Sequence, residues 1–187
     1  MNNQQEGYKQ LNSYILVTVI YDLTQEFLRR WINPRSRNWD QMDQAARSGK
    51  QNIAEGYTQQ SLEGYIKLLG VAEGSLKELL TDFEDYLRTN KLKTLNKDDP
   101  KIREFRAFRA IWVSSNQPNT PNLPKLPQEA ANMLLTFCQM ATYLINRQIA
   151  SLKEKFIQEG GFRENLFSKR RDYVSFKKRQ EFKRSEV

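Results

Sequence analysis

The side chains that could do chemistry here are acidic, because the 187 residues include no histidine and one cysteine. Without histidine, whose ordinary pKa lies nearest neutrality, the usual catalytic triads and histidine metal sites are excluded. Glu78, Asp82 and Asp85 recur at helical spacing, and a face of this kind binds a hard divalent cation when a second helix adds oxygen ligands. The alternative is a solvated acidic face, which we favour. We therefore expect a protein that is not an enzyme and holds no metal or cofactor.

The single cysteine bears on the compartment. Cys138 has no intrachain partner for a disulfide, which favours a reducing environment. It stands among Leu134, Phe137 and Ala141, which is typical of a small core residue rather than a reactive thiol. Residues 1–10 are polar, and no apolar run approaches the roughly 20 residues that a membrane span needs. We expect a cytoplasmic protein without a membrane segment.

Positive charge is the strongest signal of function. The chain has 30 Lys and Arg against 22 Asp and Glu, a formal net charge of +8, which favours a polyanionic partner. Clustered cations contact phosphates without reading sequence, so the binding should depend steeply on salt. The candidate nucleic-acid-binding residues form one group near an interhelix turn and another near the C-terminal end: Arg29, Arg30, Arg35, Arg37, Arg47, Lys50, Arg163, Lys169, Arg170, Arg171, Lys177, Lys178 and Arg179.

Aromatic residues accompany both cationic groups. Trp31 and Trp39 flank the first group and can stack on bases, although core packing is the alternative for Trp31. The C-terminal segment, residues 162–187, has nine Lys or Arg and four Asp or Glu, a net +5, with aromatic and aliphatic residues between them. We expect an arm that is mobile alone and ordered by a partner. The alternatives are a disordered solubilising tail and packing of Phe162 and Leu166 back onto the remaining chain.

Hydrophobic periodicity indicates the elements that must position these groups. We predict an all-α fold: an antiparallel up-down four-helix bundle with a helical insertion before the fourth helix and a basic C-terminal suffix. Asn38 is expected to cap the second helix and Ser61 the third. Gly70 and Gly74 within the third helix suggest a close helix crossing. The predicted helices span residues 8–31, 38–56, 61–87 and 128–158; the bundle domain is 1–159 with its insertion at 91–127, and the suffix is 160–187.

The first predicted helix is apolar on two sides. One stripe recurs every four residues from Leu11 to Trp31, and a second lies nearly opposite. A helix of this kind is either deeply buried or shared with another subunit. In so short a chain we expect the second, and so we predict a homo-oligomer. The predicted interface consists of Tyr14, Val17, Tyr21 and Leu28.

Three sequence phrases carry a family resemblance. Residues 51–56 (QNIAEG) end the second helix, where Gly56 is expected as a left-handed terminator and Asn52 and Glu55 as structural residues. Residues 73–79 (EGSLKEL) and 144–149 (LINRQI) lie in the next two long helices. This ordered set resembles the bacterial four-helix bundle proteins of ribosomal-RNA intervening sequences, and also the related accessory variability proteins of diversity-generating retroelements. Residues 159–164 (EGGFRE) resemble the suffix domain of one subgroup, a C-terminal addition to the four-helix bundle.

The resemblance implies a function and an assembly. The retroelement proteins are basic pentameric bundles that bind nucleic acid and a reverse transcriptase. This chain differs by having Asp43-Gln44 where many relatives have two arginines, and Gly49-Lys50-Gln51 where they have a proline. We therefore expect a non-catalytic nucleic-acid-binding accessory protein, with RNA as its ligand and a reverse transcriptase as a candidate partner. The alternative is a protein–protein scaffold that docks on an acidic partner without nucleic acid.

Overall fold

The structure is a computed structural model that describes residues 7–115 and 121–185, with side chains at 7–108 and 121–181. Every element in these ranges is helical and none is a strand, which confirms the all-α prediction for the described residues. Residues 116–120 of the predicted insertion lie outside them. The elements are the 3₁₀ turn η1 (Gly7–Gln10) and the helices α1 (Asn12–Trp31), α2 (Arg37–Tyr57), α3 (Leu62–Thr89), α4 (Pro100–Ser115), α5 (Pro127–Glu159) and α6 (Phe162–Ser185).

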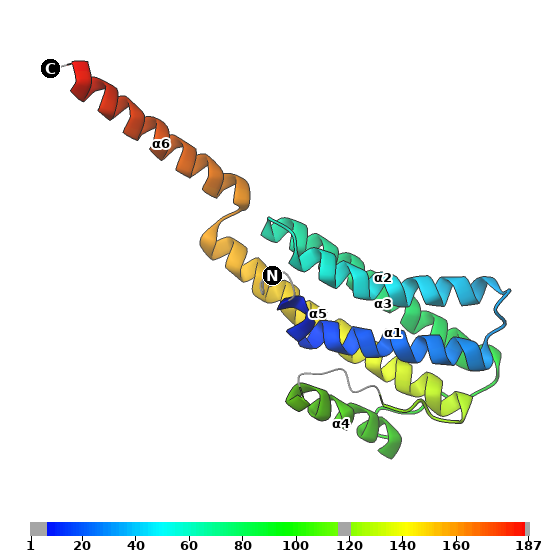
Figure 1. Ribbon diagram of the computed structural model, residues 1–187. Coiled ribbons are helices and arrows are strands. Elements are labelled where there is room, and N and C mark those ends of the chain that lie inside the picture. Colours follow the sequence, from blue (N-terminus) through cyan, green and yellow to red (C-terminus); the bar gives the residue numbers. More distant parts are fainter. Residues whose placement is uncertain (1–6, 116–120, 186–187) are drawn as a thin grey trace.

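Four helices enclose one hydrophobic core. α2 packs along α3, α3 along α5, and α1 contacts both α2 and α5 (Figure 1). We call α1, α2, α3 and α5 the helical body. Phe27, Phe83 and Phe137 are its largest fully buried side chains. The ring of Phe27 makes edge-to-face contacts with Phe83 and Tyr86, at centroid distances of 5.2 and 4.9 Å, so aromatic contacts join α1 to α3.

Helix ends explain why the body folds as it does. The Ser61 hydroxyl accepts a hydrogen bond from the Gly64 N–H at 3.1 Å, which confirms its predicted cap. The predicted cap of α2 at Asn38 is wrong, because Ser36 accepts from the Trp39 N–H and the helix starts two residues earlier than Asn38 would set it. The Ser36 hydroxyl satisfies the Trp39 N–H, one of the first amides of α2 that have no partner within the helix.

The two-sided apolar pattern of α1 has an explanation within one chain. Val17 and Leu28, which we expected at a subunit interface, are fully buried in the core of the chain itself. Tyr14 and Tyr21 are half-buried. α1 contacts α2 on one side, α5 on another and α4 as well, so both stripes find partners. Deep burial, which we had ranked second, therefore accounts for half of the proposed interface residues.

The close helix crossing lies at a different glycine from the expected pair. A Cβ placed at Gly70 or Gly74 would meet no heavy atom within 4 Å, so the expectation of a crossing there is wrong. A Cβ on the buried Gly49 would lie 3.4 Å from Leu76 of α3 and 3.6 Å from Val17 of α1. Both are ordinary van der Waals distances, so α2 packs closely on α1 and α3 at this position.

The insertion is fastened to α5. Asn132 donates to the carbonyl oxygen of Lys93 at 3.0 Å and accepts from the Leu95 N–H at 2.8 Å. Ile102 and Phe105 of α4 are buried, and α4 packs on α5. Cys138 is fully buried in α5, as expected for a core residue, and this burial raises the pKa of its thiol. Across residues 7–115 and 121–185, no helix is long and apolar enough to traverse a bilayer.

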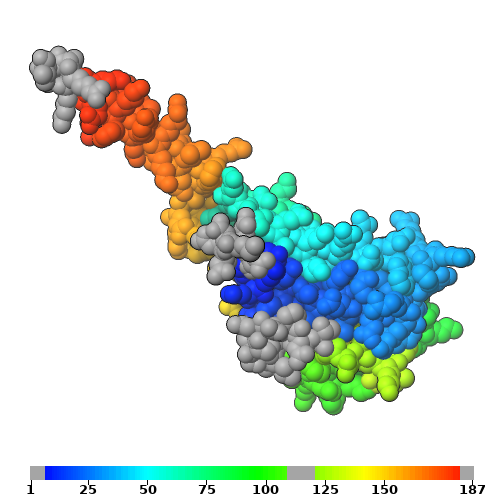
Figure 2. Space-filling model, in the orientation of Figure 1, coloured from blue at the N-terminus to red at the C-terminus, as the bar shows by residue number. Residues whose placement is uncertain are grey.

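α6 stands apart from the helical body. It continues the direction of α5 beyond the body and ends far from the other helices (Figures 1 and 2). It makes no extensive contact with any other described helix. The described part of the suffix is therefore a single helix, and none of its side chains at 162–181 is buried.

Candidate nucleic-acid interface

The largest group of exposed cations lies on α6. Arg163, Lys169, Arg170, Arg171, Lys177, Lys178 and Arg179 are all exposed. Because consecutive residues of a helix are 100° apart, each triplet, 169–171 and 177–179, covers about 200° of the circumference. The cations therefore surround most of the helix, and a phosphate backbone can approach it from several directions.

Aromatic rings are exposed between these cations. Phe167, Tyr173 and Phe176 are 70%, 64% and 59% exposed. Rings presented to solvent beside cations form the kind of surface on which single-stranded bases stack. Phe162 and Leu166 are also exposed, at 45% and 56%, so they do not pack back on the helical body as the alternative interpretation required.

The junction between α5 and α6 has a defined geometry. Gly160 has φ of 75°, a left-handed conformation that suits glycine. The Gly161 N–H donates to the Glu164 carboxylate at 2.9 Å, which caps the start of α6. A Cβ on Gly161 would lie 2.8 Å from the Glu63 carboxylate and 2.9 Å from the Phe156 ring, so a larger residue would displace these side chains. These contacts give the geometry of the junction that we predict to be a hinge.

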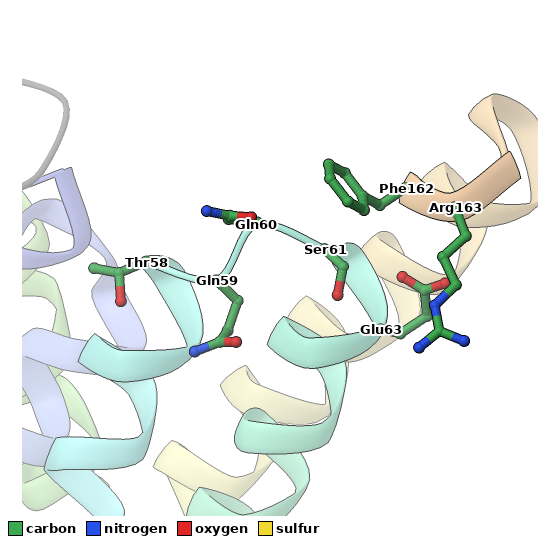
Figure 3. Close-up of a pocket in the computed structure, with 7 residues that line it drawn as sticks. All are labelled: Thr58, Gln59, Gln60, Ser61, Glu63, Phe162 and Arg163. Atoms are coloured by element: carbon green, nitrogen blue, oxygen red, sulfur yellow. The ribbon is translucent and has the colours of Figure 1, made fainter. Parts of the chain in front are cut away.

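An open cavity separates this junction from the α2–α3 loop. Its volume is about 780 Å³, and Phe162 and Arg163 face Gln59, Gln60 and Ser61 across it (Figure 3). Glu63 lies next to Arg163 in this view and reduces the local positive charge. The cavity is lined by an aromatic ring, amides and hydroxyls.

The second group of cations lies around the α1–α2 turn. Arg29, Arg35 and Arg37 are exposed there. Arg30 is engaged within the chain: its guanidinium pairs with Glu26, donates to the carbonyl oxygen of Pro124 at 3.4 Å and lies 5.6 Å from the Trp31 ring centroid. This position ties the end of α1 to the segment before α5. Arg30 is thus less available to a phosphate than its neighbours.

The aromatic and α2 residues of this group have partners in the body. Trp31 lies 5.0 Å from Phe27 between ring centroids, so it packs on the core, and Trp39 is half-buried against it. The Lys50 ammonium lies 4.0 Å from the Tyr21 ring centroid, which places a cation on an aromatic face of α1. Arg47 is exposed. Asp40 and Glu55 are also exposed on α2, and they interrupt a continuous basic stripe.

The two cationic groups do not form one patch. The α1–α2 turn and α6 lie at opposite ends of the molecule (Figure 1). α2 alone has 21 residues, or about 30 Å at the helical rise per residue. Both groups of cations can be identified from the sequence, but the distance between the groups depends on how the helices are directed and packed.

The QNIAEG phrase holds α2 against α3. The Asn52 amide donates to the Ser48 carbonyl oxygen at 2.9 Å and to the Ser48 hydroxyl at 3.1 Å, which in turn lies 2.8 Å from the Ser75 hydroxyl of α3. Glu55 is exposed and its carbonyl accepts from Thr58. These contacts stabilise the packing of α2 against α3.

Glycine is needed at position 56 for a different reason from the expected one. It lacks a positive φ, and α2 continues through Tyr57, so its role as a left-handed terminator is wrong. A Cβ at Gly56 would lie 2.8 Å from the Tyr65 ring. Glycine is needed because that ring packs directly on the α2 backbone.

The other two phrases meet across α3 and α5. The Asn146 amide donates to the Glu73 carboxylate at 3.0 Å. Gln148 donates to the Tyr65 hydroxyl and accepts from the Ser13 hydroxyl at 2.8 Å, so one amide joins α1, α3 and α5. Burial, and then the nearby Tyr57, raise the pKa of Tyr65 to about 12, and the phenol therefore stays neutral. Sequence reasoning missed this network, because its hydrogen bonds join residues that are 73 to 135 positions apart.

The three acidic residues considered as metal ligands lie in different environments on α3. Asp85 pairs with Arg88 at 2.7 Å and Glu78 is exposed, whereas Asp82 is half-buried. Burial, followed by repulsion from Glu78 and Asp85, raises the pKa of Asp82 to about 6. In the part of the chain described here, no group of three or more His, Cys, Asp or Glu residues could hold a metal ion.

Comparison with known proteins gives one match. The family model described as 23S rRNA-intervening sequence protein matches residues 10–104, just over half of the chain. The matched region begins at the end of η1 and reaches into α4, and it lies before α5 and α6. No curated protein and no solved structure matches the chain.

Proposed function

The chain belongs to the 23S rRNA-intervening sequence protein family, and from this premise we propose that it is a non-catalytic RNA-binding protein. In this proposal residues 1–159 form an antiparallel four-helix bundle with an insertion at 91–127. Residues 160–187 are an RNA-binding suffix. The observation that carries the proposal is α6, a 24-residue helix whose cations and aromatic rings are exposed together.

The charge distribution supports an electrostatic mode of binding. Six cations in the two α6 triplets are exposed, and each can contact a phosphate. The rings between them add base stacking, which favours single strands and tolerates any sequence. Arg29, Arg35, Arg37, Arg47 and Lys50 form the secondary contacts of the proposal, with Arg30 contributing least because of its internal partners.

A salt titration with a matched pair of variants tests the proposal. The Kd of the full chain for a labelled single-stranded RNA should rise at least 100-fold between about 50 and 200 mM salt if six or more phosphates are contacted. Replacing Lys177, Lys178 and Arg179 by glutamine should weaken binding. It should also reduce the number of phosphate contacts, obtained from the slope of log Kd against log salt concentration, by about three.

The control removes three exposed cations from other elements. Lys67→Gln, Lys93→Gln and Arg147→Gln together change the net charge by the same amount, and these residues lie outside α6. If this control weakened RNA binding as much as the α6 variant, only net charge would matter. No binding at any salt concentration would contradict the proposal.

The exposed rings of α6 also favour a second candidate function. Phe167, Tyr173 and Phe176 with their flanking cations fit an acidic groove on a protein, as the scaffold interpretation requires. Nucleic acid that copurifies with the protein, seen as a high 260/280 absorbance ratio, would favour RNA. Nucleic-acid-free protein that captures an acidic protein through α6 would favour the scaffold.

The finer elements of the resemblance belong to this proposal as well. We include a homo-oligomer, a pentamer by resemblance, and a reverse transcriptase as partner. Tyr14 and Tyr21 are the members of the expected interface that keep exposed surface. Light scattering of the full chain measures the oligomer, and a monomer at micromolar concentration would contradict it. Copurification with a tagged reverse transcriptase would test the partner.

A further inference from the structure

The open cavity at the start of α6 has room for a ligand. Its volume of about 780 Å³ lies within the usual range for small-molecule sites. It opens between the first turn of α6 and the α2–α3 loop (Figure 3). One wall therefore belongs to the helix that we propose to bind RNA and the other to the helical body, so a ligand in the cavity would contact both.

The lining suits an uncharged planar group. Phe162 contributes a ring that is 45% exposed. The exposed Gln60 amide makes no hydrogen bond to another residue in the described ranges, so its donor and its acceptor are both free. Glu63 and Arg163 are the charged members of the lining, and their charges are opposite. A free phosphate gains little from such a balance, whereas a nucleobase is planar, uncharged and polar at its edges.

The exposed rings of α6 lead to this cavity. At 100° per residue, Tyr173 and Phe176 lie within about 60° of Phe162 around the helix, so the three rings share one face. Arg163 follows Phe162 directly, and Lys169 lies about 9 Å farther along the helix axis. A strand whose bases stack on this face, with its phosphates on the cations, therefore reaches the cavity at the amino end of α6.

We propose that the cavity receives one base of a single-stranded RNA that lies along α6. The base stacks on Phe162, its edge pairs with the Gln60 amide, and its phosphate contacts Arg163. A glutamine amide presents a donor beside an acceptor, which every nucleobase can match on one edge, so the cavity selects single strands and not a sequence. The proposal rests on the RNA-binding function proposed above and adds a defined base site to it.

The first measurement compares a labelled single-stranded RNA with a duplex of the same length, both bound to the full chain. Phe162→Ala and Gln60→Ala, made separately, remove groups from opposite walls of the cavity. Phe162→Ala should weaken binding of the single strand about 5- to 100-fold, the range for one stacked base, and Gln60→Ala should weaken it less. Neither should change the affinity for the duplex, whose bases are already paired and stacked.

Ile157→Ala and Gln51→Ala are the matched controls. Both side chains are exposed and lie outside the cavity lining. They remove an apolar group near the end of α5 and a glutamine amide from α2, and neither should change the affinity for either RNA. Gln60→Ala leaves the sequence of α6 intact, so its effect does not depend on whether Phe162→Ala alters the start of that helix.

Hydrogen exchange gives a readout that is independent of affinity. A base in the cavity shields the α2–α3 loop, so bound single-stranded RNA should slow exchange at residues 58–61 as well as along α6. Phe162→Ala with saturating RNA should lose the protection at the loop and keep it along the rest of α6.

The outcomes distinguish the two proposals. If the variants bind both RNAs as the wild type does and only α6 is protected, the base site is overturned and RNA binding by α6 stands. An equal loss for single strand and duplex in Phe162→Ala, without any loss in Gln60→Ala, also overturns the base site, because it assigns Phe162 to the position of α6. If neither RNA binds at any salt concentration, the RNA-binding function fails and the base site fails with it.

Discussion

α5 and α6 are consecutive helices joined by two glycines, yet they are stabilised in different ways. α5 has 33 residues and buries eleven of them in the body. Among the described side chains of α6, at 162–181, none is buried. Both are rich in helix-forming residues, so propensity does not distinguish them. The comparison shows that burial organises one helix and local interactions the other.

The local interactions of α6 are weak. Glu164 caps its start, and Lys177 lies 3.9 Å from Glu181, an exposed pair that contributes about 0.5 kcal/mol or less. Most helical stability in proteins comes from tertiary packing, which α6 lacks at its described side chains. α6 therefore adds little to the stability of the fold, and its exposed surface is its main physical property.

A pair of phenylalanine substitutions tests most directly whether the helical body and α6 contribute differently to stability. Phe83→Ala removes a fully buried ring that contacts Phe27, and we expect it to lower the free energy of unfolding by about 3–5 kcal/mol. Phe176→Ala on α6 should change it by less than about 0.5 kcal/mol. Urea denaturation measures both. A large loss from Phe176→Ala would show that α6 is part of the core.

A pair of glycine substitutions sharpens the same contrast within the body. Gly56→Ala would place a methyl group 2.8 Å from the Tyr65 ring, and we expect a loss of about 1–3 kcal/mol. Gly70→Ala meets open space in the middle of α3 and should stabilise by about 0.5–1 kcal/mol. Thermal unfolding of the two variants should shift in opposite directions. A shift in the same direction would contradict this account of Gly56.

Asp82→Asn is expected to change the pH dependence of stability. The pKa of Asp82 is about 6 in the folded chain, above its ordinary 3.8, so the folded state binds this proton more tightly than the unfolded state. Stability from this group is fully present below pH 3.8 and is lost as the pH rises through 6.

The asparagine variant should therefore be more stable than the wild type at pH 7, by about 1–2 kcal/mol after allowance for solvent contact. Its advantage should disappear below about pH 4. Unfolding curves at several pH values check this. An advantage that stayed constant with pH would mean that Asp82 does not titrate as described.

The smallest expected effect concerns the start of α6. Glu164→Ala removes the acceptor of the Gly161 N–H and should lower local protection of α6 by about 0.5–1 kcal/mol, with the melting temperature of the body unchanged. Hydrogen exchange measured peptide by peptide distinguishes the two regions. Faster exchange throughout α5 as well would instead indicate that the two helices unfold as a coupled unit.

Much of the fold follows from local signals in the sequence. Apolar periodicity predicted the long helices to within a few residues, and the Ser61 hydroxyl predicted the start of α3. The cations of α6 were also recognised from sequence, because charge is visible without a fold. These features depend on neighbours along the chain.

What escaped prediction depends on residues distant in sequence. The reason for Gly56 is the Tyr65 ring, and the second apolar stripe of α1 is covered by helices whose positions periodicity does not fix. The Gln148 amide joins residues from three helices. Local patterns do not specify such contacts, so the sequence predicted the members of the candidate site and not their arrangement.

The two-glycine junction described above has a consequence for degradation. Proteases cleave segments that open locally, and the free energy of opening is near zero where few apolar contacts would be lost. α6 presents its lysines and arginines in such a segment, beyond a body whose own helices are held by a continuous core. Limited trypsin digestion should therefore trim the chain to a resistant fragment that ends near Gly160, and a bound partner on α6 should delay that cleavage.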